Sequence, residues 1–132
     1  MIPTRSRIYL LAAFLIALSP IGVSAEMGLI SEIMYHPPAG KPEYVELANN
    51  TATPLDIANW QLTGGISFEF PDFATASATA TFLKPFERIV VAPSQPADVR
   101  AAYGIPAAVR VFGPWSRNLD DNGDRVTLQD KN

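Results

Sequence analysis

Hydrophobic residues recur in short runs along the chain, and turn-forming residues separate these runs. Between Ile66 and Phe70 hydrophobic and polar residues alternate, which is the period-two pattern of a strand with one buried side. The run at 88–92 is hydrophobic almost throughout, as is typical of a central strand covered on both faces. Together the runs predict eight strands, at 28–35, 43–47, 55–63, 66–70, 81–83, 88–92, 109–112 and 125–129.

The residues between the runs indicate how these strands connect. Three prolines make 36–42 a loop, because proline cannot donate to a strand ladder. Gly64 and Gly65 predict a hairpin, and one short helix is expected at 96–103, ended by Gly104. Short strands at this spacing predict an all-β fold, an antiparallel β-sandwich with one short helix. A parallel α/β architecture is not expected, because the helices that it requires are missing.

The first 25 residues have the composition of a secretory signal peptide. Arg5 and Arg7 give a basic start, 8–18 is an apolar run, and 23–25 supplies the small residues that signal peptidase requires. A membrane anchor is the alternative, but these 11 apolar residues rise only about 16 Å as a helix, whereas a span needs about 20 residues. We therefore expect cleavage before a single domain at 26–132. The exported product would be secreted or held at the cell surface, without a transmembrane span.

Composition limits the possible partners and chemistry. Without Arg5 and Arg7, eight Lys and Arg residues remain against 13 Asp and Glu, a net charge of −5. An acidic domain without a basic cluster is not expected to bind nucleic acid.

The chain has no cysteine and one histidine, which argues against thiol catalysis and the usual zinc sites. The core alone must hold the fold, and a small exported domain without disulfides is more typical of bacteria than of animals.

Four segments carry a family likeness: 30–37 (ISEIMYHP), 43–49 (EYVELAN), 54–62 (PLDIANWQL) and 119–128 (LDDNGDRVTL). In this order they resemble the lamin tail domain family. The resemblance implies an immunoglobulin-like β-sandwich without catalytic residues. In bacteria such domains lie on exported proteins as attachment modules, often beside hydrolase or kinase-like domains. The stretch 70–105 is similar to the lamin tail domain that precedes CotH-type kinase domains.

The C-terminus departs from this likeness. The family normally continues with a glycine turn and another strand, and Asn132 looks like the first half of an Asn-Gly hairpin turn. We therefore expect a C-terminally truncated domain that lacks its last strand and is the N-terminal part of a larger multidomain surface protein. A strand edge left unpaired in this way invites self-association.

Candidate catalytic residues are few. His36 is the only imidazole, so a catalytic triad would have to use it, but it precedes Pro37 in a loop and has no nucleophile in register. Glu32, Glu43 and Glu46 are candidates for paired-carboxylate catalysis. Glu46 falls on the polar face of a strand, and Glu32 falls among apolar residues, where we expect partial burial and a hydrogen bond. We interpret all four as structural and expect no enzyme.

The segment before the last strand is the one candidate for a metal site. Asn118, Asp120, Asn122 and Asp124 have the spacing of oxygen ligands in a calcium loop. The twelfth position of such a loop is Gln129 here, which cannot supply a bidentate carboxylate. We interpret the segment as an acidic turn in which Asn122 and the glycine after it adopt positive φ, and we expect no metal. Calcium remains the alternative.

The two tryptophans are candidates for stacking against a sugar. Trp60 has the alternation of a core residue, so we expect it to be buried. Trp115 lies in a loop after Pro114, and we expect it to be the more exposed of the two, acting as a cap over one end of the sandwich.

The most consistent functional interpretation is an exported, non-catalytic attachment or protein-interaction module. Its partner would be a protein or a cell-envelope component, and it would need no cofactor. The alternatives are a carbohydrate-binding module with a calcium-stabilised acidic turn, a small hydrolase that uses Glu32 or His36, and a structural spacer.

Overall fold

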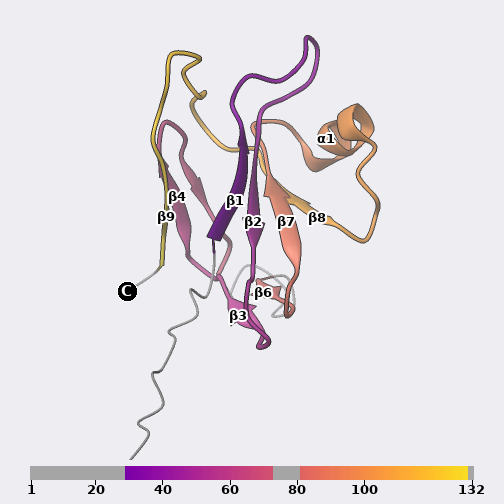
Figure 1. Ribbon diagram of the computed structural model, residues 1–132, viewed down its shortest axis with the longest axis vertical. Helices are drawn as coiled ribbons and strands as arrows, with labels where there is room; N and C mark the ends of the chain where they lie inside the picture. The colour runs from indigo at the N-terminus through magenta and orange to yellow at the C-terminus, as the bar shows by residue number, and fades with distance from the viewer. Residues whose placement is uncertain (1–28, 73–80, 131–132) are drawn as a thin grey trace, which may run out of the picture.

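The computed structural model describes residues 29–72 and 81–130 of the chain. The predicted signal peptide at 1–25 and the predicted turn at Asn132 lie outside these ranges. In chain order the elements, labelled in Figure 1, are β1 (Leu29–Met34), β2 (Tyr44–Ala48), β3 (Leu55–Asp56), β4 (Gln61–Gly64), β5 (Phe68–Glu69), β6 (Phe82–Leu83), β7 (Arg88–Val91), α1 (Pro96–Tyr103), β8 (Arg110–Phe112) and β9 (Val126–Gln129). The predicted class, all-β with one short helix, is confirmed.

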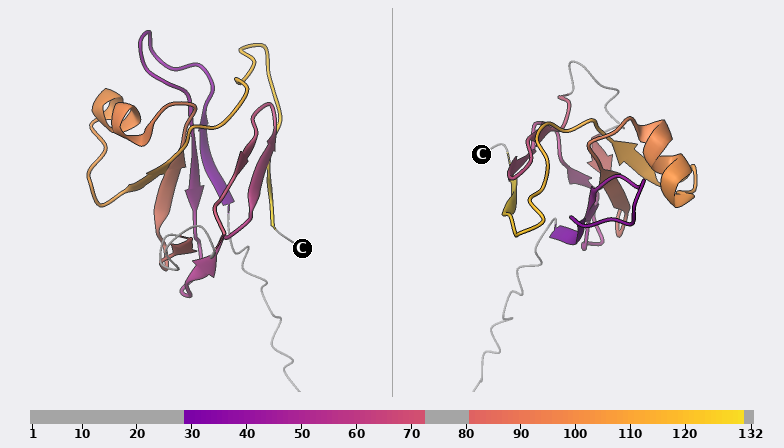
Figure 2. Two further views of the ribbon diagram at one scale, coloured as in Figure 1. Left: turned by 180° about the vertical axis from the view of Figure 1, so that it is seen from behind. Right: turned by 90° about the horizontal axis from the view of Figure 1, so that it is seen from above.

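The strands form an immunoglobulin-like sandwich. One sheet has four strands in the order β1-β2-β7-β8, and the sheet that faces it has three, in the order β5-β4-β9. A two-stranded ribbon of β3 and β6 lies at one end (Figure 1). Figure 2 shows that α1 lies on the side of the four-stranded sheet that faces away from β4 and β9.

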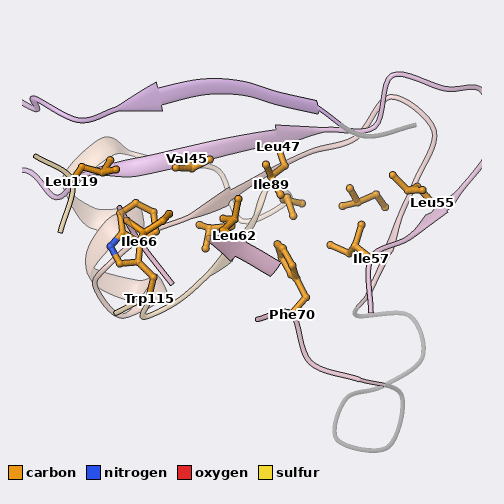
Figure 3. Close-up of a cluster of buried hydrophobic side chains, with 12 residues drawn as sticks. Val45, Leu47, Leu55, Ile57, Leu62, Ile66, Phe70, Ile89, Trp115 and Leu119 are labelled. Atoms are coloured by element: carbon orange, nitrogen blue, oxygen red, sulfur yellow. The ribbon is translucent and has the colours of Figure 1, made fainter. Parts of the chain in front are cut away.

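The core lies between the two larger sheets and follows the predicted alternation. In β2, Val45 and Leu47 point inward and are at most 2% exposed, whereas Tyr44 and Glu46 lie on the other face. Burial of an aliphatic side chain of this kind contributes about 1.5–3 kcal/mol. The buried residues of this cluster, shown in Figure 3, are Val45, Leu47, Leu55, Ile57, Leu62, Ile66, Phe70, Leu83, Ile89, Val91, Trp115 and Leu119.

One pair of strands in the four-stranded sheet is parallel, whereas the other strand pairs are antiparallel as predicted. β7 and β8 run in the same direction, and the segment 92–109 with α1 crosses between them. This is long enough for a crossover, which needs a dozen residues or more. The helix itself ends as predicted, because Gly104 adopts the left-handed conformation at φ 64°. Its Val99 is fully buried and forms a second hydrophobic cluster with Val90 on the outer face of the sheet.

The segment 55–63, which the sequence predicts as one strand, is split between two sheets. The break lies at Asn59, which has a left-handed φ of 61° that asparagine tolerates better than most residues. Just before it, the Asp56 carboxylate accepts a hydrogen bond from the Ala58 amide at 2.9 Å, which closes a local turn. β3 therefore pairs with β6, and β4 pairs with β5 and β9. The turn also changes the alternation at Trp60, which is half-buried.

Candidate functional site

A groove of about 320 Å³ opens on the outer face of the four-stranded sheet, beside α1. It exists because β2 buries every second residue in the core and presents the others on this face, while α1 and the segment after it rise along one side. The residues that line it are Tyr44, Glu46, Val90, Tyr103, Ile105 and Val109.

Two tyrosine rings form fixed walls of the groove. Tyr44 and Tyr103 meet edge to face, with ring centroids 5.2 Å apart and planes at 85°. Each hydroxyl donates a hydrogen bond away from the groove, from Tyr44 to Glu32 Oε1 at 2.6 Å and from Tyr103 to the Pro42 carbonyl at 2.7 Å. The Lys41 ammonium lies 4.8 Å from the centroid of the Tyr103 ring. The walls are therefore held from outside the groove, whether or not a ligand is present.

Arg100 fixes the third side. Its guanidinium donates hydrogen bonds to the carbonyls of Pro106 at 2.8 Å and Val109 at 2.5 Å. These bonds tie the segment after α1 back to the helix, which holds Ile105 and Val109 along the groove. Val90 is 7% exposed, and packing against α1 holds it in place.

Two carboxylates lie side by side next to Tyr44: Glu46 lines the groove, and Glu32 of β1 accepts the bond from the Tyr44 hydroxyl. Glu32 and Glu46 are direct partners in the antiparallel register of the two strands. The register shifts between Ile30 and Glu32, so Ser31 bulges and its hydroxyl donates to Glu46 Oε1 at 2.6 Å. Arg88 of β7 forms an ion pair with the same oxygen of Glu46. Glu32 receives its bond from a neutral partner, the Tyr44 hydroxyl.

These carboxylates change the acidity of the tyrosines. The hydrogen bond to Glu32 raises the pKa of Tyr44 to about 12, and burial and the charges of Glu32 and Glu46 act in the same direction. Burial raises the pKa of Tyr103 as well, and the charge of Glu32 adds to the effect. Both hydroxyls are therefore uncharged in neutral solution. Rigid aromatic walls, an aliphatic floor and carboxylates at the rim form an arrangement suited to binding a side chain.

The predicted catalytic residues do not gather in this groove. His36 Nδ1 lies 3.2 Å from Asp121 Oδ1, and both side chains are well exposed, at 74% and 66%. Glu43 accepts a hydrogen bond from the Leu119 amide at 3.2 Å. Glu32 is exposed rather than partly buried, so that expectation is wrong, although the expected hydrogen bond is present. β1 lies at the edge of its sheet, which leaves the Glu32 side chain open to solvent.

Two of the four calcium candidates, Asp120 and Asp124, have carboxylates that accept hydrogen bonds within the turn. The Asp120 carboxylate accepts hydrogen bonds from the amide and the side chain of Asn122, at 2.8 and 3.0 Å, and these bonds lower its pKa. Gly123 has φ 117° and donates to the Asp120 carbonyl at 2.9 Å. Asp124 accepts from the Arg125 amide at 2.8 Å, and Asn118 is exposed. Of the predicted pair only the glycine has a positive φ, and no group of three or more Asp, Glu, His or Cys suited to a metal occurs in residues 29–72 and 81–130.

The expectations for the two tryptophans are wrong in both cases. Trp115 is 5% exposed and belongs to the core, whereas Trp60 is half-buried at its edge. The Trp115 amide donates to the Ala92 carbonyl at 3.0 Å, and a bridge between Ser67 and Ser116 holds the segment on the second sheet. The loop around Trp115 is thus a structural part of the sandwich, which removes this residue as a platform for sugars.

Sequence reasoning missed the groove, although one signal for it was present. The hydrophobic run at 88–92 indicated a strand covered on both faces, and the outer cover is α1. Val99 and Tyr103, four residues apart, mark the face of the helix that turns toward this sheet. Tyr44 lies on the same face of β2 as Glu46, the face expected to be polar, but it is part of the groove.

A model of the lamin tail domain family matches residues 29–132. Neither curated proteins nor solved structures gave a match. Within the described residues there is no helix long and apolar enough to cross a membrane. Domains of this family have an immunoglobulin-like fold, are themselves non-catalytic and mediate protein interaction. The match covers more than half of the chain and agrees with the sandwich and with the order of its sequence motifs, so this chain belongs to the lamin tail domain family.

Proposed function

We propose that this chain is an exported attachment module that docks a protein partner in the groove beside α1. The observation that carries the proposal is the groove itself, whose two tyrosine walls are held by hydrogen bonds outside it. A preformed groove avoids part of the ordering entropy that binding costs. Protein interaction is the role of lamin tail domains, and the groove supports that role for this chain.

Export is the second part of the proposal. It rests on the basic start, the apolar run and the small residues of 1–25. Cleavage after Ala25 would leave residues 26–28 ahead of β1, which begins at Leu29. N-terminal sequencing of the protein from the culture medium or the cell surface tests this, and we expect the first residue to be Glu26.

The third part is that the module serves a larger surface protein. Its likeness to domains that stand beside hydrolase or kinase-like domains supports an accessory role, in which the groove brings a neighbouring domain to its target. The partner would be a protein or a component of the cell envelope. The reading frame beyond residue 132 tests this part directly.

Site-specific photo-cross-linking tests the groove as the docking site. A benzophenone amino acid placed at Ile105 reports on the groove, and the same amino acid at Glu69, exposed on the opposite sheet, is the matched control. In cells that produce the chain, we expect one discrete cross-linked protein from position 105 and none from position 69. The substitution Val109→Lys, which narrows the groove, should remove that product.

Equal cross-linking from both positions, or a product that survives Val109→Lys, would contradict docking in the groove. The far-ultraviolet circular dichroism of each variant verifies that the sandwich is still folded.

A further inference from the structure

We infer that the groove accepts a lysine or arginine side chain of an extended partner segment. This inference rests on the proposed function, because it specifies what the docking site recognises. It is carried by Glu46, the one carboxylate that lines the groove, and by Glu32, which faces Glu46 across β1 and β2, whereas the other lining residues are aromatic and aliphatic.

The carboxylates form an incompletely neutralised pair. Glu32 and Glu46 face each other directly across β1 and β2, an arrangement of like charges that costs free energy in a sheet. Arg88 compensates Glu46 from the side of β7. The ion pairs among the described residues do not include Glu32, whose bond comes from the neutral Tyr44 hydroxyl. A cation at this end of the groove would therefore relieve a repulsion that the fold leaves in place.

The remaining surfaces suit the stem of a basic side chain. Val90, Ile105 and Val109 offer aliphatic surface, and a lysine or arginine can bury its methylene groups there while its charged end reaches the carboxylates. The Lys41 ammonium lies 4.8 Å from the centroid of the Tyr103 ring, which shows that this ring is a stable neighbour for a cation.

The raised pKa values of Tyr44 and Tyr103 also favour a basic ligand. The charge of Glu32 contributes to the raised pKa of both Tyr44 and Tyr103, so the negative potential of this carboxylate reaches both aromatic walls. An anionic group such as a phosphate or an acidic peptide would meet this potential unfavourably. The geometry thus favours a basic protein segment over an anionic ligand.

Three synthetic pentapeptides test the inference, each acetylated and amidated, with the sequence Thr-Val-X-Val-Thr and Lys, Met or Glu at X. Met has an unbranched apolar side chain like the stem of lysine, without the charged ammonium. Binding to the chain is followed by the amide chemical shifts of Val90, Tyr103 and Ile105 in nuclear magnetic resonance titrations. We expect saturable shifts with the lysine peptide and at least fivefold weaker binding of the methionine and glutamate peptides.

Charge-neutralising variants locate the contact. Glu32→Gln keeps an oxygen that accepts the Tyr44 bond, and Glu46→Gln removes the second charge. Each should weaken binding of the lysine peptide by about fivefold, the upper range for partly exposed ion pairs. Glu69→Gln, which removes an exposed carboxylate on the opposite sheet, is the control and should leave the affinity unchanged.

Equal binding of the lysine and methionine peptides, or no saturable shift with lysine, would overturn the inference. So would an equal loss of affinity in Glu69→Gln. These results do not decide the outcome of the cross-linking experiment. A groove that binds its partner through apolar contacts alone would still give a cross-linked product from position 105 and none from position 69.

Discussion

Arg110 and Glu87 form a two-pronged ion pair, in which Nε donates to Oε1 and Nη2 donates to Oε2, each at 2.9 Å. The same Nη2 also reaches the Phe82 carbonyl at 2.7 Å. One guanidinium thereby joins β8 to β6 and to the turn before β7. Burial by itself raises the pKa of Glu87, but the bonds from Arg110 and from the Lys84 amide outweigh it and lower that pKa.

We predict that Arg110→Ala lowers the free energy of unfolding by about 2 kcal/mol, because it leaves a largely buried carboxylate without its partner. Urea unfolding at neutral pH measures the change. Arg125→Ala, at an exposed position, is the control and should cost less than about 0.5 kcal/mol. Equal losses in the two variants would show that the ion pair does not stabilise the fold.

Asn49 is a second residue whose side chain joins separate segments of the chain by hydrogen bonds. It is fully buried, and its Nδ2 donates to the carbonyls of Thr53 at 2.8 Å and Lys84 at 3.0 Å, while its Oδ1 accepts from the Thr51 amide at 3.0 Å. Asn49→Ala should cost about 2–3 kcal/mol, because several main-chain groups lose their partner. The neighbouring Asn50→Ala, at an exposed position, provides the comparison, and thermal unfolding of both variants should separate them by several degrees.

The fold was largely predictable because alternation reports directly on which side chains share a face. Ile66 and Phe70 were assigned to a buried side on this basis and both are fully buried, and the helix end at Gly104 followed from the need for a left-handed residue. Alternation does not report on which strand lies beside which. The parallel pairing of β7 with β8 depends on a long-range crossover, and no local pattern in the sequence encodes it.

The candidate site was less predictable for a related reason. A groove arises where segments distant in sequence meet, here Tyr44 of β2 and Tyr103 of α1. Single-residue arguments instead selected His36 and the acidic turn, because their chemistry is visible in the sequence. The error at Trp60 has a local cause, since the left-handed Asn59 breaks an alternation that was read straight through it.

The aromatic ring and the indole N–H of Trp115 are both buried, and we expect them to affect stability differently. The ring fills the core, but its Nε1 is buried without a hydrogen-bond partner among the described residues. Trp115→Ala should cost about 3–5 kcal/mol through the cavity that it leaves. Trp115→Phe keeps part of the ring, removes the unsatisfied donor and should cost clearly less. Urea unfolding compares the two variants, and an equal loss in both would contradict this account.

The acidic turn should not need a metal. Because the Asp120 carboxylate already accepts two bonds from Asn122, we expect that millimolar calcium leaves the Tm unchanged. Magnesium at the same concentration is the control for ionic strength. A rise in Tm with calcium alone, abolished by Asp124→Asn, would instead support the carbohydrate-binding alternative with its calcium-stabilised turn.

The Tyr44 hydroxyl should make stability sensitive to alkaline pH. Its pKa is about 12 in the folded chain and near 10 in the unfolded chain, so the folded state holds this proton more tightly. The corresponding stability is fully present below pH 10 and is lost as the pH rises through 12.

Glu32→Gln keeps an acceptor oxygen but removes the negative charge, so it should lower the pKa of Tyr44 and flatten the loss of stability above pH 10. The tyrosinate absorbance at 295 nm (a general property of phenolates) follows the titration, and urea unfolding at several pH values follows the stability. Tyr35→Phe, at an exposed position outside the groove, is the comparison variant for both measurements. A Tyr44 titration that is the same with and without the Glu32 charge would show that the two groups are not coupled.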